Sequence, residues 1–336
     1  MKRIAIVGAG SWGTALAVVA ARAGHEVQLW ARNADVVDSI NRDHVNPVYL
    51  SGTPVPPNVW ATADITAAMD GAELVILAAP SHATRRLLAD MVPSVRSETM
   101  VVSATKGIEI DTGKRISQIV DEVFPQAARP RFVCLSGPSF AKEVVEGHPT
   151  AVVAASLDSE TARTIQSELS FENLRVYTNN DVVGTELGGS VKNVMAIAAG
   201  MVAGLGFGSN SIAALITRGL SEITRLGLSE GAKIETLMGL AGLGDLVLTC
   251  TGSLSRNRFV GYELGRGRSL EVISAGMNEI AEGVKTTLAV KRLADRLGVE
   301  MPITSEVHAV LYEEKSVRDA AHELMSRPLK EEANRR

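Results

Sequence analysis

The 336-residue sequence has few cysteines, few histidines and no strong excess of charge. Its two cysteines, Cys134 and Cys250, form neither a metal-binding nor a disulfide pattern. Each lies in an apolar run, so we expect buried packing residues in a reducing compartment and no bound metal. The six histidines share no spacing, which disfavours a hydroxyacid dehydrogenase site built on histidine.

Clusters of positive charge and long uninterrupted apolar segments are also missing. The net charge is −4 and no basic tract exceeds a few residues, so no nucleic-acid partner is expected. The stretch nearest to membrane-spanning length, around residues 191–205, is rich in small residues and carries Lys192, which argues against an integral membrane segment. Glycines interrupt the apolar N-terminal stretch that superficially resembles a secretory signal, and we therefore expect a cytoplasmic protein.

Length and apolar patterning predict two domains of different class, since a single core rarely keeps growing at this size. An α/β fold is indicated, with a Rossmann-type, doubly wound and mostly parallel sheet over residues 1–180. The strand-length apolar runs are Arg3–Val7, His25–Trp30, Leu74–Ala78, Met100–Ser103, Phe132–Leu135, Ala151–Ala155 and Leu174–Tyr177. After Asp181, which has the side chain of a helix N-cap, helical periodicity predicts an all-α C-terminal domain over residues 181–336.

A glycine motif follows the first apolar run. Gly8, Gly10 and Gly13 form a G-x-G-x-x-G that opens a small-residue helical pattern extending to about Ala23. The first glycine permits a tight turn, the second lets the backbone approach a pyrophosphate, and the third lets helix and strand pack closely. This context predicts a dinucleotide site, and a glycine turn without a ligand is the alternative.

The residues after the second run indicate which dinucleotide binds. A carboxylate there would accept hydrogen bonds from both ribose hydroxyls of NAD, but the sequence reads Trp30-Ala31-Arg32. A guanidinium suits the 2′-phosphate of NADP, so Arg32 favours NADP over NAD. A solvated loop arginine is the alternative interpretation.

Two lone charges in the helical half are candidates for chemistry. Lys192 is the only charge in GGSVKNVMAIAAGMVAG, and a buried ammonium with a lowered pKa could protonate a carbonyl oxygen as hydride arrives at carbon. A lysine that reaches solvent from a helix face explains the pattern equally well. Asp245, in MGLAGLGDLVLTC, could anchor Lys192, bind a substrate hydroxyl or cap a helix.

Other polar residues lie where a ligand could reach them. Residues 251–258, TGSLSRNR, offer serine, arginine and asparagine at an expected helix start, which predicts an anion site at Arg256; a solvated basic turn is the alternative. Lys106 follows a strand and should face cofactor or substrate, because ligands bind beyond the carboxyl ends of parallel strands. Ser139, Phe140 and Ala141, which follow a Gly-Pro turn, are expected to cap a helix against the same pocket.

Sequence blocks in both halves resemble one known family. In chain order they are GAGSWGTALA, LWAR, ATKGIE, LSGPSFAKEV, GGSVKNVMAIAAG, ITRGLSEITRLG, GLAGLGDLVLTC, SLSRNRFVG, AEGVKT and MPIT. Together they resemble bacterial NAD(P)-dependent sn-glycerol-3-phosphate dehydrogenases. The resemblance implies reversible reduction of dihydroxyacetone phosphate to sn-glycerol 3-phosphate with NADPH or NADH, which supplies glycerophospholipid synthesis.

The resemblance also implies roles for individual residues. The general acid/base would be Lys192, and the other residues of the reacting centre would be Lys106, Asn193, Asp245 and Thr249. Besides the glycine motif, cofactor contacts map to Ser11, Trp12, Arg32, Tyr49, Lys106, Ala141, Arg256, Ile280 and Glu282. Substrate contacts map to Lys106, Gly137, Ser139, Lys192, Asp245, Ser255, Arg256 and Asn257. The family varies at the position of Arg32, so NAD is not excluded, and Ser190 stands where many relatives have alanine.

Two other functions fit parts of the sequence. A related reductase of a small keto acid would share the two-domain plan and the catalytic lysine, and its carboxylate substrate could also use Arg256. Such reductases lack the SLSRNR and GLAGLGD blocks. A non-catalytic NADP-binding sensor would leave Lys192 and Asp245 unexplained. The sequence sets no oligomeric state, and a homodimer is one option.

Overall fold

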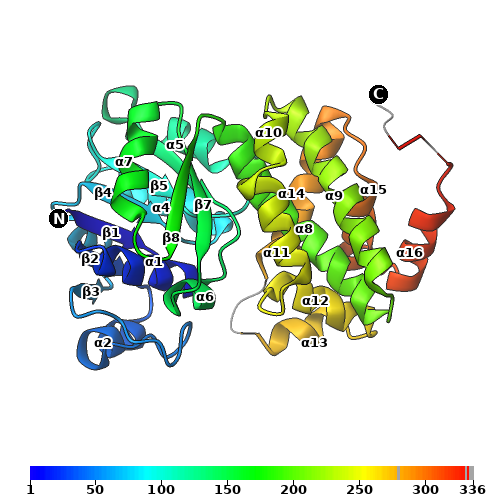
Figure 1. Ribbon diagram of the computed structural model, residues 1–336, viewed down its shortest axis with the longest axis horizontal. Helices are drawn as coiled ribbons and strands as arrows, with labels where there is room; N and C mark the ends of the chain where they lie inside the picture. The colour runs from blue at the N-terminus through cyan, green and yellow to red at the C-terminus, as the bar shows by residue number, and fades with distance from the viewer. Residues whose placement is uncertain (278–280, 330, 333–336) are drawn as a thin grey trace.

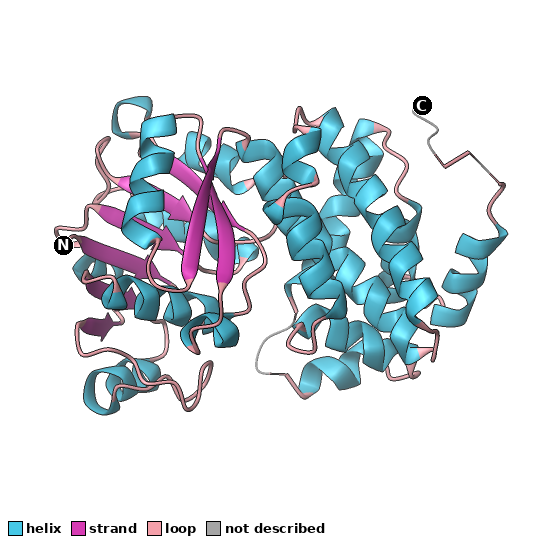
Figure 2. Cartoon of the chain, viewed as in Figure 1, coloured by secondary structure: helices cyan, strands magenta, loops and turns pink. Residues whose placement is uncertain are grey.

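The structure is a computed structural model that describes residues 1–277, 281–329 and 331–332. Its two halves differ in class: a sheet flanked by helices contains the N-terminus, and a bundle of helices follows it (Figures 1 and 2). The last strand ends at Asn179, and a long helix begins at Val182. The expected α/β class, with a Rossmann-type N-terminal part and a helical C-terminal part, is confirmed.

The sheet has eight strands in the order β3-β2-β1-β4-β5-β6-β7-β8. Their bounds are β1 (Arg3–Val7), β2 (Glu26–Trp30), β3 (Val59–Thr62), β4 (Leu74–Leu77), β5 (Met100–Ser103), β6 (Arg131–Ser136), β7 (Thr150–Ala155) and β8 (Leu174–Asn179). Neighbouring strands pair in parallel except β6 and β7, which are antiparallel. The central strands are wholly apolar in places, such as LVIL in β4, because helices cover both faces.

Strand β3 does not appear among the strands expected from the sequence. Its four residues, VWAT, alternate buried and exposed side chains, and Trp60 is 54% exposed. A four-residue edge strand pairs with one neighbour only, here β2, so it needs no continuous apolar run. Strand β3 is therefore defined by its pairing with β2, which the sequence does not reveal.

The helices cover the sheet and then form the second half. Those beside the sheet are α1 (Ser11–Arg22), α2 (Ala34–Asp43), α3 (Ile65–Met69), α4 (Ser81–Met91), α5 (Ile116–Val123), the 3₁₀ turn η1 (Gln126–Ala128), α6 (Ala141–Val145) and α7 (Ser159–Leu169). The remainder are α8 (Val182–Gly204), α9 (Ser209–Ser229), α10 (Ile234–Leu237), the π-helical segment η2 (Leu240–Gly244), α11 (Asp245–Thr251), α12 (Arg256–Gly265), α13 (Leu270–Ala275), α14 (Glu282–Leu297), α15 (Pro302–Tyr312) and α16 (Val317–Ser326).

Helix α8 is the centre of the helical half, and α9, α11, α12 and α14 pack around it. Asp181 caps its N-terminus as expected, accepting a hydrogen bond from the Gly184 N–H at 2.8 Å. Residues 182–204 and 234–251 have the length and hydropathy of membrane spans by composition alone. In the first, 83% of the most apolar window is buried inside the protein, which is the position of a core helix.

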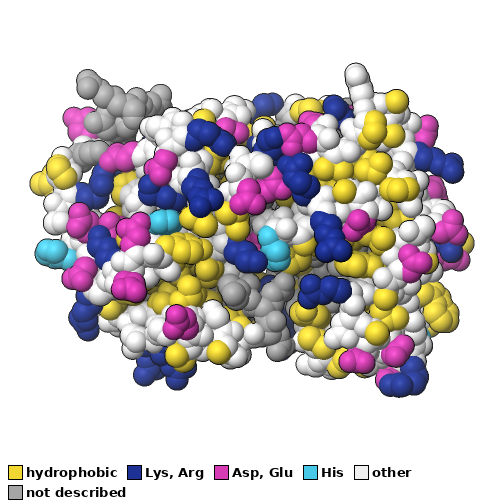
Figure 3. Space-filling model, turned by 180° about the vertical axis from the view of Figure 1, so that it is seen from behind, with side chains coloured by type: hydrophobic (Ala, Val, Ile, Leu, Met, Phe, Trp, Pro, Cys, Tyr) yellow, Lys and Arg dark blue, Asp and Glu magenta, His cyan; other side chains and the backbone are white. Residues whose placement is uncertain are grey.

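The surface carries charges of both signs, and the two cysteines lie inside the protein. Positive and negative side chains are interspersed over the face shown in Figure 3. Both Cys134 and Cys250 are buried and unpaired, and burial raises the pKa of the Cys250 thiol to about 12, so both behave as apolar packing residues. Among the residues described, no group of three or more His, Cys, Asp or Glu side chains is placed to hold a metal ion.

Candidate active site

The carboxyl ends of β1, β4, β5 and β6 meet at one edge of the sheet, because these neighbours pair in parallel. Strand order reverses about β1, which lies between β2 and β4, and loops leave this edge at Gly8, Ala78, Ala104 and Gly137. A crevice outside such a switch point is where open α/β sheets bind ligands. Helices α8 and α11 of the helical half reach the same edge through the contacts described below.

The glycine motif forms a tight turn from β1 into α1. Gly8 has φ +118°, and a Cβ there would lie 2.8 Å from the Ala78 carbonyl oxygen. A Cβ on Gly13 would lie 1.8 Å from the Gly8 carbonyl oxygen, so close packing of helix and strand requires glycine. A Cβ on Gly10 would meet nothing within 4 Å, and α1 has no side-chain cap. The turn therefore presents an open helix N-terminus beside the second glycine.

Residues expected to contact a cofactor gather around this turn. Ser11 donates its hydroxyl to the Tyr49 carbonyl at 2.9 Å, and Trp12 packs against the same apolar cluster as Ala141. The buried Trp12 Nε1 has no hydrogen-bond partner among the described residues. Asn46, which sequence reasoning missed, is fully buried and donates to the Ala9 carbonyl at 2.9 Å while accepting from the Tyr49 N–H.

Arg32 lies beside the glycine turn at the end of β2. The Gly8 N–H donates to the Trp30 carbonyl at 3.1 Å, which holds the two strand ends together. Arg32 follows two residues later and is exposed.

A cluster of two lysines and one carboxylate connects the two halves, and in it Lys192 and Asp245 are buried while Lys106 is partly exposed. Lys192 Nζ donates to Asp245 Oδ1 at 2.5 Å, and Lys106 Nζ donates to Asp245 Oδ2 at 2.7 Å. Lys192 also donates to Thr249 Oγ1 at 2.7 Å, and Lys106 to the Gly137 carbonyl at 3.0 Å. Lys192 is only 6% exposed, so it does not reach solvent from its helix face. The sequence left three roles open for Asp245, and the structure shows the contact by which it anchors Lys192.

Burial and the neighbouring charges shift the pKa values of both Lys192 and Asp245. Burial lowers the pKa of Lys192 to about 8, although the Asp245 carboxylate opposes that shift and the Lys106 ammonium adds to it. Burial alone would raise the pKa of Asp245, but the two ammonium groups outweigh burial and lower it. Asp245 therefore stays ionised, while Lys192 is a cation that releases its proton readily near neutral pH.

Small residues in α8 allow the cluster to form. A Cβ on Gly188 would lie 2.6 Å from the Ala241 carbonyl, and one on Gly189 would lie 2.4 Å from Ser136 Oγ. The helix therefore approaches η2 on one side and the end of β6 on the other. Larger side chains at these positions would move Lys192 away from Asp245 and Lys106.

A second group of polar side chains lies beside the lysine cluster and begins at Asn193, the residue after Lys192 in α8. Asn257 Nδ2 donates to Asn193 Oδ1 at 3.0 Å, and Asn257 Oδ1 accepts from the Gly283 N–H at 2.8 Å. Ser255 is the N-cap of α12 and accepts from the Arg258 N–H at 3.2 Å. Arg256 is the first residue of that helix, so the predicted helix start lies where the sequence indicated.

Two further contacts complete the edge. The N-cap of α6 is Phe140 and the helix begins at Ala141, so the helix starts in the expected segment. The Ser139 side chain does not cap it, because its hydroxyl donates to the Gly137 carbonyl at 3.0 Å. Glu282, at the start of α14, accepts from the Ser81 N–H at 3.1 Å and from the Ser81 hydroxyl. Sequence reasoning missed Ser81 as a partner of Glu282, since their separation of 201 residues leaves no local signal.

The structure thus sorts the expected site residues into three neighbouring groups. The glycine-turn group contains Gly8, Gly10, Ser11, Trp12, Gly13, Arg32, Tyr49 and Ala141; the lysine group contains Lys106, Gly137, Ser139, Lys192, Asp245 and Thr249; the α12 group contains Asn193, Ser255, Arg256, Asn257 and Glu282. Ile280 lies outside the described residues.

A Rossmann-type sheet with a glycine turn, joined to a helical half that brings the buried Lys192 to the strand ends, defines a two-domain nicotinamide-dependent dehydrogenase. Comparison with known families identifies which one. A model of the NAD-dependent glycerol-3-phosphate dehydrogenase N-terminus matches residues 3–162, and a model of the C-terminus matches residues 181–322. The chain belongs to the NAD-dependent glycerol-3-phosphate dehydrogenase family.

Relatives and a crystal structure agree with this assignment. Glycerol-3-phosphate dehydrogenase (NAD(P)+) from Koribacter versatilis is 56% identical over 330 residues, covering 98% of each chain. The enzyme of the same name from Nitratidesulfovibrio vulgaris is 51% identical over 330 residues, covering 98% of this chain and all of its own. A crystal structure of glycerol-3-phosphate dehydrogenase from Coxiella burnetii has a TM-score of 0.93 and 42% identity, covering 97% of this chain and 99% of that one.

Proposed function

We propose that this protein reduces dihydroxyacetone phosphate to sn-glycerol 3-phosphate with NADPH, reversibly, and that NADH can replace NADPH. The observation that carries the proposal is the Lys192–Asp245–Lys106 cluster at the carboxyl edge of the sheet, in which Lys192 and Asp245 are buried. The names of the relatives support the same substrate and cofactor class. Family membership disfavours the alternative of a keto-acid reductase.

The glycine turn fits the pyrophosphate of a dinucleotide. The open space at Gly10 and the α1 N-terminus without a side-chain cap provide room and backbone N–H donors. Ser11 and Trp12 would line this cradle, and Arg32 would pair with the 2′-phosphate. When bound, NADPH supplies the hydride, while the protein supplies position and charge. We assign Tyr49, Ala141, Arg256, Glu282 and, outside the described residues, Ile280 to the rest of the cofactor contacts.

Lys192 is the proposed proton donor. As hydride reaches the carbonyl carbon of the substrate, negative charge develops on the carbonyl oxygen. A proton from Lys192 Nζ converts that oxygen into the alcohol of the product, and the neutral amine can accept it back in the reverse direction. The pKa near 8 leaves the amine protonated at neutral pH but able to transfer its proton.

The neighbours of Lys192 hold it and supply charge. Asp245 fixes both ammonium groups, and Thr249 accepts from Lys192 while donating to the Asp245 carbonyl at 2.7 Å. Lys106 contributes a second positive charge beside the developing oxyanion. Asn193 adjoins Lys192 and orients the Asn257 amide.

The phosphate of the substrate is assigned to the start of α12. Arg256 offers a guanidinium, and Ser255 and Asn257 flank it at the first turn of the helix. Gly137 and Ser139 face the substrate from the end of β6 in this proposal. Binding energy from the remote phosphate can then orient the carbonyl for reaction.

A substrate panel tests the proposal directly. The absorbance of NADPH and NADH is followed with dihydroxyacetone phosphate, dihydroxyacetone, and a set of 2-keto and 3-keto acids. We expect turnover with dihydroxyacetone phosphate at a far higher kcat/KM than with any other substrate. Preferred turnover of a keto acid would contradict the proposal, and tight cofactor binding without turnover of any substrate would indicate a sensor.

The remaining assignments follow from the same proposal. We place the dinucleotide-binding domain over residues 1–180 and the substrate domain over residues 181–336, in the cytoplasm, supplying glycerophospholipid synthesis. A homodimer is the assembly that we would test, by light scattering of the purified protein. No nucleic-acid partner or membrane insertion enters this account.

A further inference from the structure

A buried carboxylate outside the proposed reacting centre joins the two halves of the protein. Glu186, in the second turn of α8, is 6% exposed. It accepts hydrogen bonds from the Ser117 N–H at 2.7 Å, the Ser117 hydroxyl at 2.6 Å and Arg115 Nη1 at 2.8 Å. Arg115 is the N-cap residue of α5, and Ser117 lies in its first turn. A side chain of the helical half therefore caps a helix of the sheet half.

This contact bears on Lys192, because Glu186 and Lys192 share one helix. They are six residues apart, which is about 9 Å along the helix axis. Ser117 lies just beyond the segment 106–115, which leads from β5 to α5 and begins with Lys106. Helix α8 and this segment therefore meet twice, at Glu186 and through Asp245. A shift of one against the other at Glu186 would change the distance between the lysines at Asp245.

Packing between these two contacts transmits such a shift. A Cβ on Gly189 would lie 3.8 Å from Lys106 Cγ, so the stem of Lys106 lies against α8. Ile108 of the segment is 1% exposed and belongs to the same apolar cluster as Leu187 and Val191 of α8. Close-packed interiors transmit displacements because they leave little free volume.

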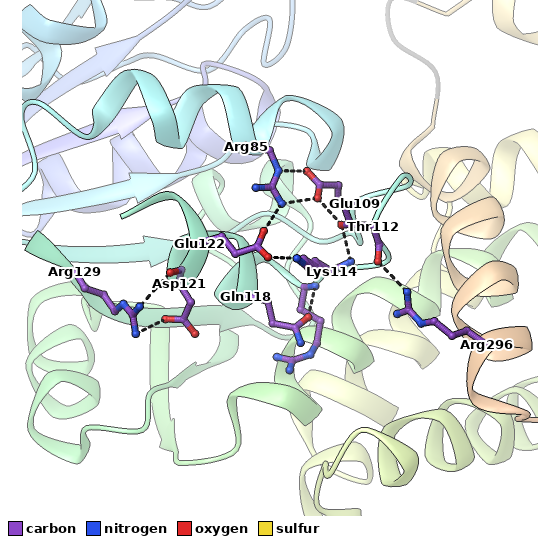
Figure 4. Close-up of polar contacts among 10 residues, drawn as sticks. Arg85, Glu109, Thr112, Lys114, Gln118, Asp121, Glu122, Arg129 and Arg296 are labelled. Atoms are coloured by element: carbon purple, nitrogen blue, oxygen red, sulfur yellow. Dashed lines mark hydrogen bonds and ion pairs between the residues drawn. The ribbon is translucent and has the colours of Figure 1, made fainter. Parts of the chain in front are cut away.

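Other polar contacts of the segment are more exposed. Arg85 donates to both Glu109 and Glu122, in each case at 2.8 Å (Figure 4). Arg296 of α14 donates to the Thr112 carbonyl at 3.0 Å (Figure 4). The side chains of Arg85 and Glu109 are 38% and 13% exposed, whereas those of Arg115 and Glu186 are 11% and 4% exposed. Water compensates least for the loss of the buried pair.

We propose that Glu186 is a positioning residue of the reacting centre. By capping α5 and pairing with Arg115, it fixes α8 against the segment 106–115 and so holds Lys192 and Lys106 on the two oxygens of one carboxylate. The inference rests on the proposed roles of Lys192 and Lys106. It assigns no contact with substrate or cofactor to Glu186 itself.

The test is Glu186→Gln, which keeps the size of the side chain but places an amide donor opposite groups that themselves donate. We expect kcat for dihydroxyacetone phosphate to fall about ten- to a hundredfold, the effect of a misplacement of about 1 Å in a reacting centre. The Kd of NADPH, measured by fluorescence, should stay within about twofold because its main contacts lie at the glycine turn. The pH midpoint of kcat should also move, since it reports the surroundings of Lys192.

The chain offers a matched control in Glu222. This carboxylate is 2% exposed and accepts from the Ile303 N–H at 2.6 Å, the Thr304 N–H at 3.1 Å and the Thr304 hydroxyl at 3.0 Å. Glu222 lies in α9 and caps α15, but both of these helices belong to the helical half. Glu222→Gln should lower the melting temperature and leave kcat and its pH midpoint unchanged.

A second variant covers the case in which Glu186→Gln does not fold. Ser117→Ala removes only the hydroxyl donor, and we expect it to lower kcat about threefold with a far-UV circular dichroism spectrum like that of the parent. If the folded Glu186→Gln variant keeps its kcat and pH midpoint, or changes them no more than Glu222→Gln does, the proposal is overturned. Unchanged kcat in Ser117→Ala would overturn it where Glu186→Gln is unfolded. Failure of the unmodified protein to reduce dihydroxyacetone phosphate would instead count against the proposed function.

Discussion

Replacing Asp245 with asparagine tests the electrostatic design of the lysine cluster. The change keeps the size of the side chain but removes the charge that both lysines contact, at 2.5 and 2.7 Å. A charge-assisted hydrogen bond contributes about 1.5–3 kcal/mol, and two are weakened here. If about 2.7 kcal/mol of that appears in the chemical step, kcat for dihydroxyacetone phosphate falls about a hundredfold.

The same variant makes a prediction about pH. In the parent, the protonated form of Lys192 is the acid for reduction, so kcat for reduction should fall as pH rises through about 8. The Asp245 carboxylate raises the pKa of Lys192, and its loss should therefore move that midpoint to lower pH. In the reverse direction, kcat should rise through the same midpoint because the neutral amine is the base.

The assay is steady-state kcat against pH with both substrates saturating, and the NADPH Kd checks that the fold survives. Cys250→Ala, which alters a buried side chain on the same helix without changing a charge, is the control and should keep kcat within about threefold. A kcat for Asp245→Asn within about threefold of the parent, with an unmoved midpoint, would show that the Asp245 charge does not tune Lys192.

Two further variants test the binding residues. Arg32→Ala should weaken NADPH binding roughly ten- to a hundredfold and leave NADH binding nearly unchanged, because only NADP carries the 2′-phosphate. Fluorescence titrations with both cofactors measure this, and equal losses would show that Arg32 does not select between them. Arg256→Ala should lower kcat/KM for dihydroxyacetone phosphate roughly ten- to a hundredfold and barely change the slow reduction of dihydroxyacetone. If both substrates lose equally, Arg256 acts on the cofactor or the fold, and Lys106 is the next candidate for the phosphate contact.

Local sequence patterns were sufficient for the features that depend on neighbouring residues. The glycine turn, the strand ends, the cap at Asp181 and the helix start at Arg256 lie where the residue types indicated, because each depends on geometry within a few positions. Lys192, the lone charge in an apolar helix, is indeed buried. A buried ammonium requires a charged or hydrogen-bonding partner, which made the residue a candidate.

Features that depend on distant partners could not be read in this way. Asp245 and Lys106 are 139 residues apart, and Glu186 and Ser117 are 69 residues apart, so only the fold brings them together. Strand β3 requires β2 as its partner, and the reversal of β7 depends on which edge of β6 remains free. Asn46 gave no signal because a buried asparagine in a loop resembles a surface turn residue in sequence.

The most direct test of the account is the turnover of Lys192→Met, because the account assigns the proton of the reaction to this one amine. The variant is compared with the unmodified protein at about pH 7, with NADPH and dihydroxyacetone phosphate both saturating, after its fold and NADPH Kd are shown to be unchanged. We expect a kcat at least about a hundredfold lower, the usual loss on removing a positioned acid. A folded, NADPH-binding variant that turns over within a few-fold of the parent would contradict it and leave Lys192 as a structural residue.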